Sequence, residues 1–305
     1  MAAIENLLTL QVTMLVLLFT GFLLVKGKVV SGEFRKAMTD FIIRFILPCN
    51  IVKSFLMEFD TQILRDCMAV LLVSCATQLF SIVLGRVLYG RAPDGRRQPL
   101  LYGIQVSNAG FLGSPIVEGL YGAQGLLYAS VYLIPQRIMM WSLGVACFSG
   151  STGKGVVKKV LTHPCIIAVF IVLVLMLSQI SLPQWLSQPL GMVGGCNTAL
   201  SLLVVGGVLA ELDPKSVVNR QTVFYCLIRL VLIPLAVLGG CLALGLERLV
   251  VQCAVVLAGM PAPLTTAMLA SQYGKDEPFA VSLIFLSTVA SMATIPLLCL
   301  LMLAL

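Results

Sequence analysis

Apolar residues fall into ten long stretches along the chain, each ending at charged residues or at a cluster of Gly and Pro. An α-helix needs about 20 apolar residues to cross a bilayer, and each stretch is about that long. None shows the short alternating pattern of a barrel strand. We therefore expect an all-α polytopic membrane protein with ten transmembrane helices, numbered first to tenth: Asn6–Lys26, Phe34–Met57, Cys67–Leu88, Leu100–Tyr121, Leu126–Phe148, Pro164–Ile180, Leu190–Leu212, Val223–Gly245, Leu249–Tyr273 and Phe279–Leu305.

The connections between these segments differ in their content of Lys and Arg. Fourteen of the twenty basic residues lie in the odd-numbered connections, whereas the even-numbered ones hold Arg65 and Arg248. Lys and Arg are retained on the cytoplasmic side of a membrane. We therefore expect the odd-numbered connections in the cytoplasm and both termini outside, in the cell (inner or plasma) membrane.

The longest cytoplasmic connection divides the chain into five segments plus five. Residues 1–149 form the first repeat, the Gly- and Lys-rich stretch 150–162 a linker, and residues 163–305 the second repeat. An odd number of spans in each half gives the halves opposite orientations in the membrane, so the sequence predicts a 5+5 inverted repeat. Two short echoes support it: Cys49-Asn50 recurs as Cys196-Asn197, and Tyr121-Gly122 as Tyr273-Gly274.

Composition excludes a soluble module. The chain is 59% hydrophobic and 11% charged, whereas a soluble domain is about 25% charged. The net charge of +7 is scattered over short connections and forms no basic face, so the bilayer is the expected partner and nucleic acid is not. Ten cysteines lie mostly within apolar runs, without CxxC or metal-ligand spacing. We interpret them as buried small hydrophobes and expect no metal and no cofactor.

The fourth and ninth segments each carry a helix-breaking cluster in mid-membrane. One runs from Ser107-Asn108 to Ser114-Pro115, and the other includes Pro261, Pro263, Thr265 and Thr266. Proline removes a backbone donor, which frees backbone groups that lipid cannot satisfy but that protein or a water-filled cavity can. A half-helix N-terminus exposed there attracts a carboxylate. Prolines also kink membrane helices for packing alone, but matched clusters in both halves favour a substrate site.

Further polar residues lie inside the predicted spans, where they are costly and usually functional. Arg137 could neutralise an anion or pair with Glu118. Asn50 and Asn197 could donate to a carboxylate or simply join helices. Asp40 and Arg44, four residues apart, are expected to form an internal pair.

At Asn108 to Gly122, at Met260-Pro261 through Tyr273-Gly274 and at Ser287-Thr288, the sequence resembles the auxin efflux carrier family, including its short bacterial members. The likeness covers nearly the whole chain. Leu161-Thr162-His163-Pro164 is similar to the Asn-Pro that opens the sixth segment in that family, with His163 in place of Asn. The long cytoplasmic loop of many plant members is reduced to a short linker.

The resemblance implies that the fourth and ninth segments are broken and cross each other. It also implies a bundle that slides like an elevator against a scaffold of segments 1, 2, 6 and 7, organic-anion substrates such as indole-3-acetate, malate or malonate, and a homodimer. By motif position, the residues that look like substrate-site residues are Asn108, Pro115, Pro261, Asn50 and Asn197.

These observations favour an efflux carrier of small carboxylates with alternating access. A proton- or cation-coupled symporter or exchanger of the same architecture is one alternative, but the segments 3, 4, 5, 9 and 10 offer no carboxylate near their centres. A carboxylate sensor is another alternative. An enzyme is disfavoured because the only histidine is His163, and no catalytic constellation is present.

Overall fold

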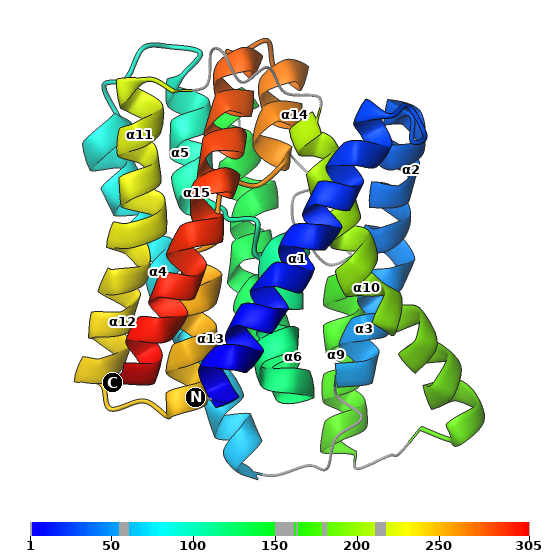
Figure 1. Ribbon diagram of the computed structural model, residues 1–305. Coiled ribbons are helices and arrows are strands. Elements are labelled where there is room, and N and C mark those ends of the chain that lie inside the picture. Colours follow the sequence, from blue (N-terminus) through cyan, green and yellow to red (C-terminus); the bar gives the residue numbers. More distant parts are fainter. Residues whose placement is uncertain are drawn as a thin grey trace.

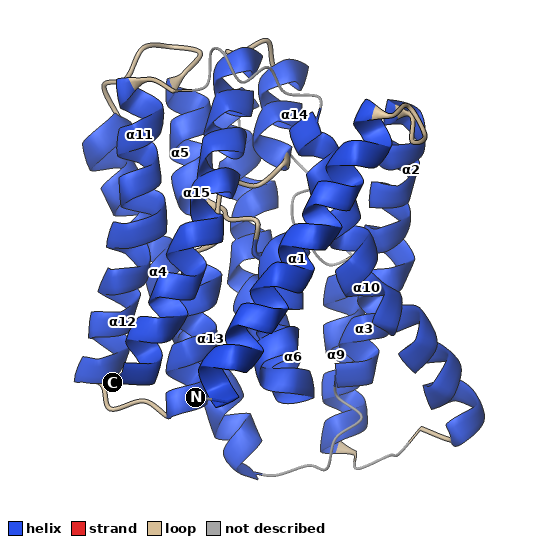
Figure 2. Ribbon diagram, viewed as in Figure 1, coloured by secondary structure: helices blue, strands red, loops and turns tan. Residues whose placement is uncertain are grey.

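The computed structural model describes residues 2–54, 61–149, 162, 164–178, 182–210 and 218–304. These residues form helices joined by short connections and contain no strand (Figures 1 and 2). Helices lie at all ten predicted segments. The linker 150–161 and His163 lie outside the described residues.

One group of helices comprises the first, second, sixth and seventh segments. Here α1 packs along α10, α10 against α3, and α3 against α9 (Figure 1). The second segment is continuous, because a π-helical turn, η1, joins its two α-helices. The bounds are α1 Ala2–Lys26, α2 Gly32–Phe41, η1 Ile42–Ile46, α3 Leu47–Ser54, α9 Pro164–Leu177 and α10 Gln184–Ala210.

Glycines bring α1 and α10 into backbone contact. A Cβ atom on Gly21 would overlap the carbonyl of Leu203, and one on Gly206 would overlap the carbonyl of Leu18. In a membrane, where apolar association gains nothing from water, such small residues let helices approach closely enough for van der Waals packing. Gly194 of α10 likewise allows close packing against the backbone of Asn50 in α3.

The remaining segments form the second group, in which α6 packs against α4 and α13, and α15 against α14 and α11. Its bounds are α4 Thr61–Tyr89, α5 Arg97–Gln105, η2 Ala109–Gly113, α6 Ser114–Met139, η3 Met140–Gly144, α7 Val145–Ser149, α11 Arg220–Leu227, η5 Ile228–Leu232, α12 Ile233–Ala243, α13 Arg248–Ala258, α14 Thr265–Gln272 and α15 Glu277–Ala304.

Within the described residues, four helical stretches are long and apolar enough to cross a membrane, or five if the bent stretch from Arg97 to Phe148 counts as one. The ninth segment does not pass this length test because it is divided into two short helices. The 11 residues of α13 rise only about 16 Å, although α13 and α14 together cover the predicted ninth segment. The described chain is therefore a multi-pass, all-helical membrane protein, and the count of ten spans stays a prediction.

Two local predictions are wrong. Asp40 and Arg44 form no ion pair with each other, because η1 begins at Ile42 and its wider turn changes the i, i+4 register on which the pair depended. The cysteines are not uniformly buried: all ten are free thiols, but Cys75 and Cys196 are exposed. Both lie on the outer surface of long apolar helices.

Candidate functional site

The two broken segments cross at their breaks. Backbone between α5 and η2, residues 106–108, is non-helical, and so is the stretch 259–264 between α13 and α14. Figure 2 shows these loops in tan in the interior of the helical body. The backbone N–H of Asn108 donates to the carbonyl of Pro261 at 2.8 Å. Asn108 and Pro261, predicted from separate motifs 153 positions apart, are thus direct partners.

Side chains from three other segments satisfy the broken backbone. Gln136 of α6 donates to the carbonyl of Ser107 at 2.7 Å and accepts from its hydroxyl at 2.9 Å. Ser287 of α15 accepts from the N–H of Ala262 at 3.1 Å. Protein side chains therefore replace the missing helical partners of several backbone groups at the breaks.

Arg229 of η5 joins the two breaks. Its Nε donates to the carbonyl of Met260 at 3.0 Å, and its Nη1 donates to the carbonyl of Ile104 at 3.2 Å. The side chain is 3% exposed. One buried cation therefore holds the last turn of α5 and the break after α13 in a fixed relation, and adds positive charge to the crossing.

The predicted prolines and threonine of the crossing have structural contacts. Pro115 lies in the first turn of α6 and is buried, as are Pro261 and Pro263. The carbonyl of Pro263 accepts from the N–H of Thr266 at 3.0 Å, which starts α14. The hydroxyls of Thr265 and Tyr102 lie 2.8 Å apart and share a hydrogen bond, which ties α14 to α5.

Asn50 and Asn197 lie in the other helix group, on α3 and α10. Asn50 Nδ2 donates to Glu118 Oε2 of α6 at 3.1 Å. Asn197 Oδ1 accepts from Ser201 at 3.4 Å on its own helix. Helix α10 contacts η2, the turn that follows Asn108. The two asparagines are therefore on the helices that face the first broken segment across the boundary between the groups.

Arg137 is buried beside Gln136 on α6, and its guanidinium interacts electrostatically with the Cys165 thiol of α9. It makes no ion pair with Glu118 among the described residues, because Glu118 instead contacts Asn50 and Lys53. Of the two interpretations of Arg137, the pair with Glu118 is thus wrong.

Several predicted site residues hold buried polar atoms without a partner in the described part of the chain. Three are donors: Asn108 Nδ2, Arg137 Nη1 and Asn197 Nδ2. Asn50 Oδ1, an acceptor, is also unpaired, as is Gln105 Oε1 at the end of α5. Native proteins rarely leave buried donors unused. Donors of this kind suit the oxygens of an anion.

Comparison with known proteins identifies the family of the chain. A family model described as membrane transport protein matches residues 6–160 and 151–299. The chain belongs to this family. It is the auxin efflux carrier family that the motifs of the fourth and ninth segments indicated.

Two relatives cover nearly the full length. An uncharacterized transporter of Methanothermobacter thermautotrophicus is 26% identical over 290 residues, 93% of this chain and 95% of the relative. An uncharacterized transporter of Methanocaldococcus jannaschii is 21% identical over 301 residues, 93% of this chain and 94% of the relative. The family is one of membrane transporters.

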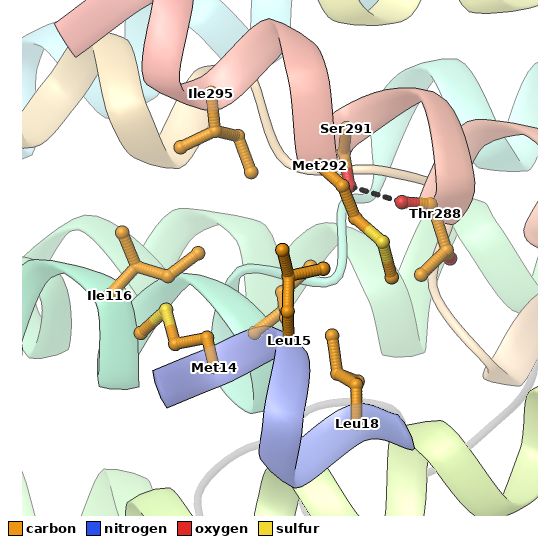
Figure 3. Close-up of a pocket in the computed structure, with 9 residues that line it drawn as sticks. Met14, Leu15, Leu18, Ile116, Thr288, Ser291, Met292 and Ile295 are labelled. Atoms are coloured by element: carbon orange, nitrogen blue, oxygen red, sulfur yellow. Dashed lines mark hydrogen bonds between the residues drawn. The ribbon is translucent and has the colours of Figure 1, made fainter. Parts of the chain in front are cut away.

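A groove opens beside the crossing of this family member, between α1 and the second helix group (Figure 3). It is a small groove, lined mainly by apolar side chains of α1, the fourth segment and α15. Leu112 of η2 and Thr288 of α15 belong to its wall. None of the eight predicted substrate residues lines this groove, so it adjoins the crossing without being the predicted site.

Sequence reasoning assigned no role to Arg229, Gln136 or Ser287. The signal for the first two was present, because both are polar residues inside predicted spans. Asp66 was missed altogether, because the predicted third segment began one residue later. In the structure α4 begins at Thr61, and Asp66 is 6% exposed, accepting from Tyr128 at 2.8 Å and Gln62 at 2.9 Å.

Metal binding finds no support in the part of the chain that the structure describes. That part contains no group of three or more His, Cys, Asp and Glu side chains that could hold an ion. At the crossing, Arg229 supplies a guanidinium group. What the arrangement offers chemically is hydrogen-bond donation and positive charge.

Proposed function

We propose that this member of the auxin efflux carrier family carries small organic anions, with carboxylates as the chemical class. The observation that carries the proposal is the set of unpaired buried donors Asn108 Nδ2, Arg137 Nη1 and Asn197 Nδ2. Asn108 lies at the crossing, where Arg229 adds a positive charge. Amide and guanidinium donors recognise a carboxylate. They do not distinguish among carboxylates of similar size.

The proposed transport mechanism is alternating access by an elevator. The helix group α1, α2, α3, α9 and α10 serves as the scaffold, and the second group, which contains the crossing, moves against it. Support comes from the distribution of the donors, since Asn108 and Arg137 belong to one group and Asn197 to the other. A site shared between two bodies opens when one moves past the other.

The proposed architecture is a 5+5 inverted repeat of residues 1–149 and 163–305, with ten spans and both termini outside the cell membrane. Both termini lie at one end of the molecule, and the connections after α1, α4 and α14 lie at the other (Figure 1). The echoed glycines Gly122 and Gly274 share a positive φ, of 64° and 61°. A homodimer is proposed from the family resemblance alone.

The test is flux of radiolabelled lactate, malate, malonate and indole-3-acetate in proteoliposomes, with and without a membrane potential. We expect saturable flux of at least one of them. Asn108→Ala should reduce that flux tenfold or more, by loss of about 1.4 kcal/mol or more of binding. Gln184→Ala, at the exposed start of α10, is the matched control and should transport normally.

Each outcome has a clear meaning. If folded and inserted protein shows no flux of any tested anion, the proposal that the protein carries carboxylates is refuted. Saturable binding of an anion without flux would instead support the sensor. Equal flux in Asn108→Ala and Gln184→Ala would leave the proposed carrier function standing but would refute the proposed site.

A further inference from the structure

Glu118 is a carboxylate at the boundary between the two helix groups. It lies on α6, one turn after Pro115, and faces α3. Its Oε2 accepts from Asn50 Nδ2 at 3.1 Å, and its Oε1 lies 4.0 Å from Lys53 Nζ. Its side chain is 20% exposed. Among the described residues, this is the ion pair that joins the first helix group to the second.

The two partners of Glu118 are groups that would bind the carboxylate of a substrate. Asn50 offers an amide N–H, and Lys53 offers an ammonium group. Asn50 is fully buried, and its Nδ2 already donates to the protein's own carboxylate. A substrate anion that uses Asn50 and Lys53 must therefore displace an anion that is covalently part of the transporter.

We propose that Glu118 couples carboxylate binding to the uptake of one proton. The ionised side chain of Glu118 competes with the substrate for Asn50 and Lys53. When Glu118 takes up a proton, its attraction to Lys53 is lost, and the incoming carboxylate replaces it without a change in the net charge of the site. Proton and anion then bind and move together. This inference rests on the proposed function and adds its coupling ion.

Other titratable groups on the elements packed against α6 contact different places. Asp66 of α4 bonds Tyr128 further along α6, and Arg248, Cys253 and Cys299 interact with Tyr121. On α9, Cys165 lies near Arg137. Helix α10 carries Cys196, which is exposed, α3 also carries the buried thiol of Cys49, and α1 carries no titratable side chain between Glu5 and Lys26. Lys53 is thus the charge that Glu118 meets.

Competition of this kind has a defined pH dependence. Over the range in which Glu118 is ionised, each unit of acidification should strengthen the apparent affinity about tenfold, because one proton is bound with each anion. Lactate is a suitable probe, since its carboxyl group stays ionised between about pH 5.5 and 7.5, above the ordinary range of carboxyl pKa values.

The experiment measures lactate binding and flux for the wild-type protein, Glu118→Gln and Glu277→Gln over that range. The last variant removes an exposed carboxylate at the start of α15 and is the matched control. Wild type and Glu277→Gln should show the tenfold slope. Glu118→Gln should bind lactate with an affinity that does not change with pH and that equals or exceeds the wild-type affinity at the acid end.

Proton uptake by the wild-type protein gives a readout that does not depend on the variant's folding. In weakly buffered solution, binding of one lactate should take up close to one proton. The inference is overturned if lactate binds without proton uptake, or if the lactate affinity of Glu118→Gln still changes tenfold per pH unit. The proposed transport of carboxylates stands in either case. If none of the tested carboxylates binds or crosses, the proposed function fails and this inference fails with it.

Discussion

Replacement of Arg229 by Leu tests whether the crossing depends on one buried cation. The guanidinium donates to the carbonyls of Met260 and Ile104, at 3.0 and 3.2 Å. Hydrogen bonds that involve a charged group contribute about 1.5–3 kcal/mol each. Their loss in Arg229→Leu would cost about 3–6 kcal/mol, of which part is recovered because no cation has to be desolvated. We expect a net loss of about 2–4 kcal/mol of stability.

The assay is denaturant unfolding in detergent micelles, followed by circular dichroism. Arg248→Leu is the matched control: its arginine also donates to a carbonyl, that of Met302, but through one longer bond of 3.4 Å in a partly exposed position. It should lose less than about 1 kcal/mol. Arg229→Lys should lie between the two, because a compact ammonium group lacks the fork that reaches two carbonyls.

A free energy of unfolding for Arg229→Leu within about 0.5 kcal/mol of wild type would refute the reasoning, since that is the range of neutral surface substitutions. It would mean that other groups or water satisfy both carbonyls. Loss of transport with unchanged stability would point instead to a direct electrostatic effect of Arg229 on the anion.

Three further predictions concern helix packing and a connection between helices. Gly206→Val should separate α1 from α10, because its Cβ would overlap the Leu18 carbonyl. We expect the free energy of unfolding to fall by about 1–3 kcal/mol in the same assay. Gly239→Val is the control, because a Cβ at Gly239 meets open space. Cys241→Ser buries a hydroxyl and should lower the melting temperature, whereas Cys75→Ser, at an exposed position, should change it less. The hydrogen bond from Gln98, followed by the interaction with Lys275, holds the pKa of Asp94 below its usual value of 3.8. Because the pKa of Asp94 is lower in the folded state than in the unfolded state, Asp94 stabilises the fold at pH values above the unfolded pKa. This stabilisation is lost as the pH falls through the folded pKa. The difference in melting temperature between wild type and Asp94→Asn should therefore be present at about pH 6 and shrink as the pH falls below the usual value of 3.8, and a constant difference would contradict the assignment.

Hydrophobic segments and helix breaks were predictable because they depend on local chemistry. Lys26 ends α1 and Pro164 begins α9 as expected. The breaks in the fourth and ninth segments fall at the predicted clusters, because proline and glycine act within a few residues of their own position. An even number of segments predicts that both termini lie at one end, where the structure also has them (Figure 1). The side of the membrane that the termini face stays a prediction.

Partners and π-helical turns could not be predicted from the sequence. Insertion of one residue into a helix at Ile42–Ile46 leaves no local sequence signal, yet it removed the expected contact of Asp40 with Arg44. The partner of Glu118 depends on how α3 lies against α6. Asp66 was assigned to a connection because charged residues were used to end the apolar segments, a rule that fails where Tyr128 satisfies the carboxylate inside the helix group.

The contacts at the crossing also change which groups are candidates to bind an anion. From the sequence, the breaks themselves were expected to supply free amides and carbonyls. The structure occupies many of them: the N–H of Asn108 and the carbonyl of Pro261 bond each other, and Arg229 takes two more carbonyls. The side-chain amide of Asn108, in contrast, has an unpaired donor. In the proposed function, the breaks therefore mainly fix the position of Asn108, and side chains recognise the anion. Substitution of Asn108 should therefore impair binding without unfolding the crossing, whereas substitution of Arg229 should weaken the crossing itself.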